Sequence, residues 1–215
     1  AVLTMIVGVL GAVAQSDIKR LLSFHIISQI GYLIMGLSLS SPLSLAAALY
    51  FMVHIVLVKT SLFLCAGLAE KATGTTDLYR MGGLLRRRPY LACLFLVAAT
   101  SLAGLPPLSG FFGKLALILA GFEQHEFAVV AVAIAVSMLT LFSMIKIWTQ
   151  GFMKKAPAEL QEEGRPQPLL FWSAVGLVGL AVVAAVAAAP LFSLAQRAAQ
   201  QLGDPAPYIT AVLGR

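Results

Sequence analysis

Five residues that can carry or relay a proton lie in stretches of the chain that are otherwise apolar. Lys59 and Lys114 each place an ammonium group among hydrophobic residues, Tyr50 and His54 precede Lys59 in the same stretch, and His25 lies in the one before it. A lysine at the centre of a membrane helix costs about 2.5 kcal/mol or more and usually has a function. Buried lysine and histidine side chains can both gain and lose a proton near neutral pH. Residue types of this kind, with no acidic residue beside them, are suited to passing protons.

Their spacing suggests how they share a path. Tyr50 and His54 are four residues apart and therefore lie on one face of a helix. His54 and Lys59 point about 140° apart on an ideal helix, so we expect them to line consecutive parts of one hydrated path, unless a π-bulge brings them together. His25 follows a basic elbow and suits a relay site or a polar packing position equally. Lys146 lies near the end of its apolar stretch, and we expect it to extend to the membrane surface.

The stretch "SLAGLPPLSGFFGK" predicts a break in a membrane helix just before Lys114. A continuous helix over Tyr90–Gly121 would be about 48 Å long, whereas the apolar core of a bilayer is about 30 Å thick. The predicted helix-breaking residues are Gly104, Pro106, Pro107 and Gly110. The prolines remove two backbone donors, and we expect both glycines to relax the limits on φ. Broken helices recur where ions bind near the midplane, so we expect Lys114 to be a protonatable group at a hydrated midplane. The alternative is a proline kink with a lysine that reaches the surface.

The elements that position these residues are membrane helices. Sixty per cent of the residues are hydrophobic, 11% are charged and the mean hydropathy is +0.91, outside the range of soluble domains. The predicted spans are 1–14 (partial), 21–39, 43–69, 90–121 (broken), 127–150 and 168–189. They predict an all-α, polytopic transmembrane helix bundle over 1–190, with 191–215 as an interfacial tail. We expect Ala1–Ala14 to be the end of a span that starts before this sequence, and Ser16 to be the N-cap of the next helix, with Asp17 in its first turn.

The net charge of +6 reflects topology, because Lys and Arg occupy alternate connections between the predicted spans. This alternation places the Arg86–Arg88 loop and the polar segment 154–168 in the cytoplasm, and Glu123–Glu126 outside. We therefore expect no nucleic-acid partner. Cys65 and Cys93 lie inside predicted spans and suit packing. No catalytic residues, metal site or cofactor site are predicted, because the sequence has no metal-ligand spacing, phosphate-binding loop or carboxylate pair.

Four motifs carry a family resemblance: "QSDIKRLLSFHIISQIGY", "HIVLVKTSLFLCAG", "MGGL" and "SLAGLPPLSGFFGK". They resemble the antiporter-like, proton-conducting membrane subunits. This family includes the large subunits of Mrp-type multisubunit sodium/proton antiporters and the L, M and N subunits of respiratory complex I, with relatives in membrane-bound hydrogenases. Within it, "HxxxxKTxLFL" and the tail "DPAPYITAVLG" are most similar to the D subunits of Mrp antiporters.

The resemblance implies the C-terminal part of an inverted-repeat fold in which each repeat has a broken helix and a key lysine. It makes Lys114 the broken-helix lysine of the second half-channel, and Lys59 with His54 the relay between the two half-channels. It also implies a multi-pass protein of the bacterial inner membrane that works with other membrane subunits, moves protons and sodium ions, and is not itself an enzyme.

Three interpretations remain open on sequence alone. The first is a subunit of a sodium/proton antiporter, and the second is the proton-pumping arm of a redox enzyme such as complex I. The third is a structural membrane anchor whose polar residues only pack. The intramembrane Lys59 and Lys114 count against the anchor, because an anchor gains nothing from buried ammonium groups.

Overall fold

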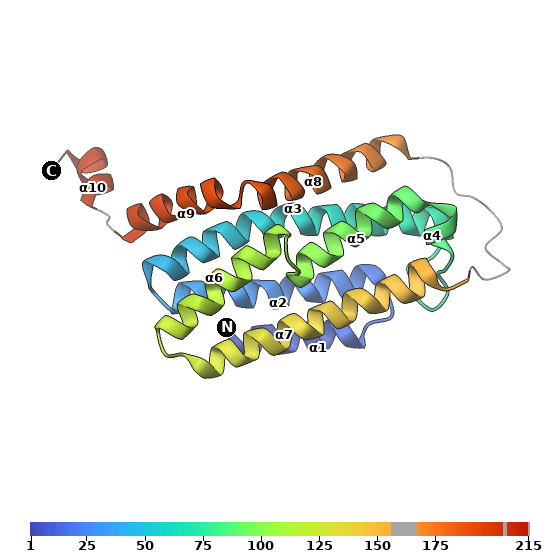
Figure 1. Cartoon of the computed structure of the whole chain (residues 1–215), viewed down its shortest axis with the longest axis horizontal. Coiled ribbons are helices and arrows are strands. Elements are labelled where there is room, and N and C mark those ends of the chain that lie inside the picture. Colours follow the sequence, from blue (N-terminus) through green and yellow to red (C-terminus); the bar gives the residue numbers. More distant parts are fainter. Residues whose placement is uncertain (156–166, 204–205, 215) are drawn as a thin grey trace.

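The computed structural model describes residues 1–155, 167–203 and 206–214, and these residues form a bundle of helices with no strand. The long helices run side by side along one direction (Figure 1). In chain order the elements are α1 (Val2–Ala14), α2 (Ile18–Ser38), α3 (Pro42–Thr73), α4 (Leu84–Arg87), α5 (Pro89–Ala103), α6 (Ser109–Glu123), α7 (Phe127–Ile147), the π-helix η1 (Trp148–Met153), α8 (Pro168–Val186), α9 (Ala188–Gly203) and α10 (Ala206–Leu213). The predicted all-α fold class is confirmed.

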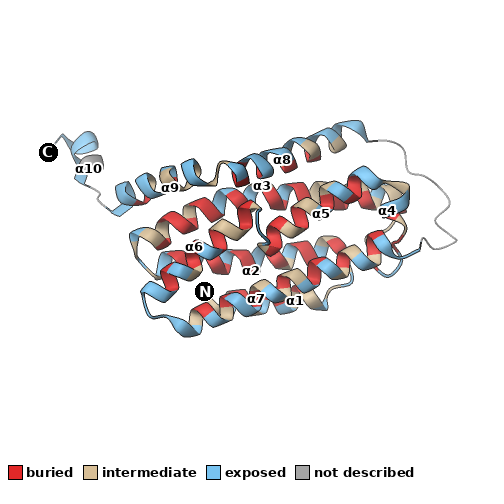
Figure 2. Cartoon of the chain, in the orientation of Figure 1, coloured by how far each residue is buried: buried red, intermediate tan, exposed pale blue. Residues whose placement is uncertain are grey.

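Four helices are long and apolar enough to cross a membrane: Ile18–Ser38, Pro42–Thr73, Phe127–Met153 and Pro168–Val186. The helices α1 and α5 are apolar but shorter. Inward faces are buried and outward faces exposed (Figure 2), and the outward faces carry large apolar side chains, as lipid contact requires. The helix α8 ends at Val186, before the predicted limit of 189, and α9 follows directly. The division into a membrane bundle and an interfacial tail stays a prediction, and most of the predicted polar linker lies outside the described residues.

The start of α2 is fixed by contacts with a distant connection. Asp17 is the N-cap, and its carboxylate accepts hydrogen bonds from the backbone N–H of Arg20, at 2.9 Å, and from the hydroxyl of Thr76. The predicted cap at Ser16 is therefore wrong. Burial acts to raise the pKa of Asp17, but the hydrogen bonds from Thr76 and the backbone outweigh it and hold the pKa below its usual value.

The longest helix, α3, lies at the centre of the bundle and packs against α2, α5, α6, α8 and α9. It begins with a capping box, in which the Ser41 hydroxyl accepts from the Ser44 N–H and the Ser44 hydroxyl accepts from the Ser41 N–H. It ends at Gly74, whose φ of 70° suits a left-handed C-cap. Its central position places His54 and Lys59 inside the bundle.

The predicted helix break lies between α5 and α6, near the middle of the bundle (Figure 1). Gly104 caps α5 with φ 87°, and Pro106 and Pro107 lie in the connection. The prediction that Gly110 relaxes φ is wrong, because Gly110 is an ordinary helical residue of α6. Gly110 is needed for close approach: a Cβ there would lie 1.9 Å from the carbonyl oxygen of Ser101. The discontinuous helix itself is confirmed.

Two large apolar clusters and a smaller one form the core of the bundle. One large cluster gathers residues such as Leu22, Leu62 and Ile147, the other gathers residues such as Met35, Phe51 and Val130, and the small one lies where α3 meets α9. Buried polar residues also lie inside the bundle, on α2, α3, α5, α6 and α7. We call ten of them the central polar layer: His25, Ser28, Gln29, His54, Lys59, Ser101, Ser109, Lys114, Thr140 and Ser143.

Candidate functional site

Lys114 lies at the helix break with its ammonium group fully engaged. Its Nζ donates to the carbonyl oxygens of Leu102 and Ala103, both at 3.1 Å, and to Oγ of Ser137 at 3.0 Å. The side chain is 4% exposed, and its Nζ lies 5.2 Å from the centre of the Tyr32 ring. An ammonium has three donors, so all of them have an acceptor. The side chain turns back to the break and does not extend to the surface.

The break supplies the acceptors. Leu102 and Ala103 are the last residues of α5, and the last carbonyls of a helix have no donor within it. They also form the negative end of the helix dipole, which favours a cation. The ring of Tyr32 adds its electron-rich face and is fixed by a hydrogen bond of 2.5 Å from its hydroxyl to the Ala133 carbonyl. The break between α5 and α6 therefore forms a site that stabilises the Lys114 ammonium group.

Lys59 has a much sparser environment. It is 5% exposed, and its Nζ donates one hydrogen bond, 3.1 Å long, to the carbonyl of Leu22 in α2. Within the described part of the chain, the one ion pair is Lys19–Glu70, with 2.6 Å between Nζ and Oε2 and both side chains partly exposed. Neither central lysine is therefore held by a carboxylate from these residues.

His54 ties α3 to both halves of the broken helix. Its Nδ1 lies 2.8 Å from Oγ of Ser109 at the start of α6, and that hydroxyl lies 3.3 Å from Oγ of Ser101 near the end of α5. The ring stacks on Phe51 at 5.5 Å. Its Nε2 is buried without a hydrogen-bond partner among the described residues and faces the bare Cα of Gly110. The series from His54 to Ser101 ends beside Leu102, which accepts from Lys114.

The other two predicted residues are placed differently. His25 is fully buried in the central polar layer, with Nε2 2.6 Å from Oγ of Ser143 and no partner for Nδ1 among the described residues. Tyr50 faces away from the layer: its hydroxyl donates to the Ala184 carbonyl at 3.4 Å, and its ring packs on Phe192. The structure thus brings His54 and Lys114 to the break, Lys59 to α2, His25 to α7, and Tyr50 to α8 and α9.

The sequence analysis missed several polar residues, although helical spacing could have found them. On α2, His25, Gln29 and Tyr32 are four and three residues apart and share a buried face. Both amide atoms of Gln29 are buried without a partner among the described residues. On α7, Ser137, which accepts from Lys114, is followed at intervals of three residues by the buried Thr140 and Ser143. Within apolar segments, such polar residues at helical intervals mark one interior path.

That face of α2 links the surroundings of the two lysines. It runs from Leu22, which accepts from Lys59, past His25 and Gln29 to Tyr32, which lies beneath Lys114. Ten residues of helix span about 15 Å. Chemically, the arrangement can hold a proton at either end and offers imidazole, amide and hydroxyl groups between them. In the described ranges there is no group of three or more His, Cys, Asp or Glu residues that could bind a metal ion.

The chain is similar in sequence and fold to subunits of Na⁺/H⁺ antiporters and of respiratory complex I. The chain is 48% identical over 211 residues to the D subunit of the Na⁺/H⁺ antiporter of Alkalihalophilus pseudofirmus; the match covers 98% of this chain and 43% of that relative. The Mrp complex of a Dietzia species contains a chain that matches with a TM-score of 0.90 and 34% identity, covering 99% of this chain and 48% of that one. Respiratory complex I of Thermus thermophilus contains one with a TM-score of 0.80 and 25% identity, over 94% and 44%.

These similarities cover nearly all of this chain but less than half of each of those relatives. They agree with a multi-pass membrane protein of an antiporter-like fold, as the motifs predict. The sequence profile described as NADH:quinone oxidoreductase/Mrp antiporter, TM, matches residues 1–142, which include the broken helix, Lys59 and Lys114. The chain therefore belongs to the NADH:quinone oxidoreductase/Mrp antiporter transmembrane family.

Proposed function

We propose that this chain is the C-terminal part of a proton-conducting subunit in an Mrp-type Na⁺/H⁺ antiporter of the bacterial inner membrane. The observation that carries the proposal is Lys114, a buried ammonium held at a helix break by carbonyls and a hydroxyl. Similarity to the D subunit of a Na⁺/H⁺ antiporter supports it. On this proposal the protein acts in transport and is not itself an enzyme, and the similarity to an antiporter subunit supports that role.

Lys114 works as a proton-holding site with two states. In the charged state the ammonium donates to Leu102, Ala103 and Ser137, and the Ser137 hydroxyl donates onward to Ala103 at 3.1 Å. When the proton leaves, the amine has two N–H groups and a lone pair. The Ser137 hydroxyl can then turn and donate to that lone pair, so that neither state leaves this pair of side chains without a hydrogen bond.

Lys59 and Lys114 exchange protons along the buried face of α2. The charged form of Lys114 has three acceptors, whereas that of Lys59 has one, so the proton is better held at Lys114. His25 and Gln29 lie between them and serve as relay and bridging groups. His54 connects α3 to the break through Ser109 and orients the same region.

Other membrane subunits complete the pathway, and sodium transport is a property of the whole assembly. A second candidate is a membrane subunit of a proton-translocating NADH:quinone oxidoreductase, or of a related membrane-bound hydrogenase. The match to a chain of respiratory complex I over 94% of this sequence favours it. The two candidates share the proton path and differ in the energy source that partner subunits supply.

The deciding experiment replaces Lys114 in the full-length protein within its complex. Lys114→Ala removes the proton-holding group and is expected to abolish transport. Lys114→Arg is expected to fail as well, because a guanidinium keeps its proton at any physiological pH. The measurement is sodium- or pH-gradient-driven transport in vesicles, normalised to the amount of assembled complex.

Lys146→Arg is the matched control. Lys146 also donates to two backbone carbonyls, those of Val13 at 3.0 Å and Gln15 at 2.8 Å, but at the end of α1 and outside the central polar layer. Its arginine variant is expected to transport at the wild-type rate. Full activity of Lys114→Arg would show that the site needs only a fixed positive charge, and the proton-relay proposal would be wrong.

A further inference from the structure

The motif "MGGL", Met81–Leu84, lies in the connection that leads from α3 to α4. The backbone N–H of Gly83 donates to the carbonyl of Lys154, just after η1, at 2.6 Å. A Cβ on Gly82 would lie 2.6 Å from the carbonyl oxygen of Lys155 and 3.1 Å from that of Lys154. The two glycines therefore bring this connection directly against the backbone at the end of the α7–η1 helix.

The same connection also holds the start of α2. The N–H of Ile18 donates to the carbonyl of Thr76, and the N–H of Leu78 donates to that of Ser16, both at 2.9 Å. The Thr76 hydroxyl donates to the carboxylate of Asp17, the N-cap of α2. One short connection is therefore bonded to the beginning of α2 and to the end of the α7–η1 helix.

A direct bond between these two helices completes the arrangement. Lys146 of α7 donates to the carbonyl of Gln15 at 2.8 Å. Three segments are thus joined in pairs: residues 15–18, the connection 75–83 and the end of the α7–η1 helix. We call them the three-way junction. Because each segment is bonded to both of the others, a change in one pair has to move at least one of the helices that leave the junction.

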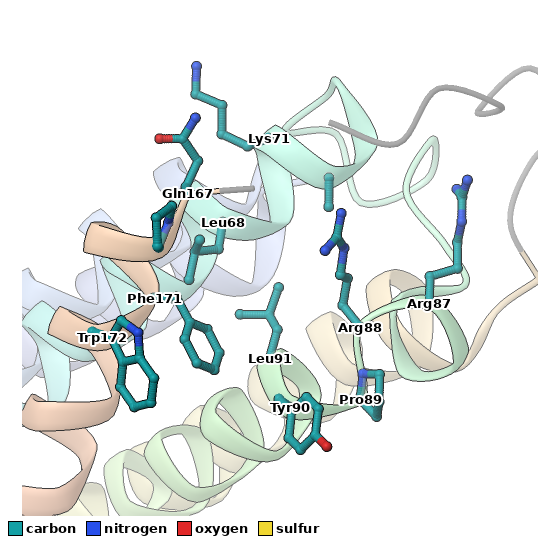
Figure 3. Close-up of a pocket in the computed structure, with 12 residues that line it drawn as sticks. Leu68, Lys71, Arg87, Arg88, Pro89, Tyr90, Leu91, Gln167, Phe171 and Trp172 are labelled. Carbon is teal, nitrogen blue, oxygen red and sulfur yellow. The ribbon is translucent and has the colours of Figure 1, made fainter. Parts of the chain in front are cut away.

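The connection is also fixed by its own packing. Leu78 and Met81 are fully buried in a large apolar cluster that includes side chains of α2, α3, α5 and α7. Beyond the motif, α4 packs against η1 and α5, and Arg87 and Arg88 at its end line a groove with residues of α3, α5 and α8 (Figure 3). The connection therefore cannot move away from the end of η1 without disturbing this packing.

The helices α2 and α7 meet again at His25 and Ser143. Nε2 of His25 lies 2.6 Å from Oγ of Ser143, and that hydroxyl donates to the Thr140 carbonyl at 2.8 Å. His25 is about two helical turns from Ile18, and Ser143 is about three turns from Lys154. The contact between the imidazole and the hydroxyl therefore depends on how the two helices leave the junction.

We propose that the three-way junction positions His25 against Ser143, and that Gly82 is the positioning residue on which it depends. Gly82 has this role because its neighbours are backbone oxygens, which cannot turn aside as a side chain can. The effect on transport rests on the proposed function, in which His25 is a relay group. The effect on the contact between His25 and Ser143 does not.

The size of the effect follows from the geometry. In Gly82→Ala, moving the new methyl group from 2.6 Å to ordinary contact at 3.4 Å requires a separation of about 0.8 Å. A hydrogen bond from α2 to the Ala133 carbonyl holds α7 further along. Ser143 lies about midway between Ala133 and Lys154, so tilting about Ala133 carries about 0.4 Å of the movement to Ser143. Since a misplacement of about 1 Å can slow a reaction about 100-fold, we expect transport to slow about six-fold.

The test uses the full-length protein in its complex. Solid-state NMR of the protein with ¹⁵N-labelled histidine gives the Nε2 resonance of His25, assigned as the signal that is missing from His25→Gln. Gly82→Ala is expected to move this resonance and to slow the decay of a pH gradient about six-fold. Ser143→Ala removes the contact, so in that background Gly82→Ala is expected to slow transport no further.

Gly151→Ala is the matched control, because Gly151 lies in η1 at the same end of the bundle and nothing lies within 4 Å of a Cβ built on it. It is expected to leave both the resonance and the transport rate unchanged. A His25 resonance that does not move in Gly82→Ala would overturn the inference, as would a loss of transport that is equally large with and without Ser143. A moved resonance with a wild-type transport rate would support the positioning and instead remove His25 from the proposed proton path.

A second variant keeps the inference testable if Gly82→Ala does not assemble. Lys154→Met removes the 2.7 Å hydrogen bond from Nζ to the Tyr79 carbonyl, which joins the same two segments of the junction, and Lys154 is exposed. It is expected to assemble and to move the His25 resonance in the same direction as Gly82→Ala, but by less. An unmoved resonance in this variant would overturn the inference as well.

Discussion

Replacing Gly110 with alanine tests how closely the two half-helices must pack for the proton path to work. A Cβ at this position would lie 1.9 Å from the Ser101 carbonyl oxygen and 2.8 Å from Nε2 of His54. The first of these atoms belongs to the backbone of α5 and cannot turn aside as a side chain can. The new methyl group can therefore be accommodated only if α6 moves away from α5.

The required movement can be worked out from the same contact. Ordinary van der Waals contact begins at 3.4 Å, so the helices must separate by about 1.5 Å. Overpacking of this kind costs about 1–3 kcal/mol. The shift also lengthens the 2.8 Å contact between His54 and Ser109 and draws Lys114 away from the carbonyls of α5. A misplacement of about 1 Å can slow a reaction about 100-fold, and we expect a loss of that order in proton transport.

The assay is decay of a pH gradient in vesicles that contain the full-length complex, divided by the amount of assembled protein. Gly176→Ala is the control, because nothing lies within 4 Å of a Cβ built on Gly176 in α8. It makes the same chemical change in a helix and is expected to leave transport at the wild-type rate. If Gly110→Ala assembles and transports like Gly176→Ala, the tight packing at the break has no part in conduction and our reasoning is refuted.

Three further predictions concern other parts of the structure. Lys59→Ala is expected to reduce transport at least ten-fold while the complex still assembles; a wild-type rate of gradient decay would make Lys59 structural. Ser137→Ala removes one of the three acceptors of Lys114 and is expected to slow transport about ten-fold in the same assay, since a hydrogen bond to a charged group contributes about 1.5–3 kcal/mol. Ser137→Thr keeps the hydroxyl and is expected to transport at the wild-type rate. Asp17→Ala removes a helix cap and the bond from Thr76 and should cost about 2 kcal/mol at pH 7. Because folding lowers the pKa of Asp17, its contribution to the free energy of unfolding is present above about pH 4 and is lost as the pH falls through the folded pKa. The unfolding midpoints of wild type and variant should therefore converge in acid. Midpoints that stay equally far apart would contradict this account.

Much of the fold could be predicted because membrane helices are specified by local sequence. Hydropathy over about 20 residues finds a span, and adjacent prolines within one predict its interruption. Lys59 and Lys114 stand out for the same reason, as single charges in apolar segments. What they bind could not be predicted, since the acceptors of Lys114 include Ser137, on another helix 23 residues away.

The wrong predictions have the same cause, which is contact with residues that are distant in the sequence or on another helix. Ser16 suited an N-cap by type, but Thr76, 59 residues from Asp17, helps to fix the carboxylate that serves as the cap. The prediction that Lys146 reaches the membrane surface stays a prediction, but its acceptors, the carbonyls of Val13 and Gln15, lie more than 130 residues before it and could not be found from local sequence. Gly110 was expected to adopt a special φ, whereas the demand on it is the approach of another helix. Local rules give an element and its breaks, and tertiary contacts decide which polar group meets which.

The backbone carbonyls that hold the central lysines have a consequence for how a gradient is conserved. A carboxylate partner could accept the proton from an ammonium and pass it on at once, but a peptide carbonyl cannot be protonated at any pH a cell meets. The carbonyl oxygens of Leu22, Leu102 and Ala103 therefore stabilise the charged ammonium groups but cannot accept a proton from them. In the proposed transport cycle, a proton placed on either lysine therefore stays until a base comes within reach, and these carbonyls help to suppress leakage between the steps of the cycle.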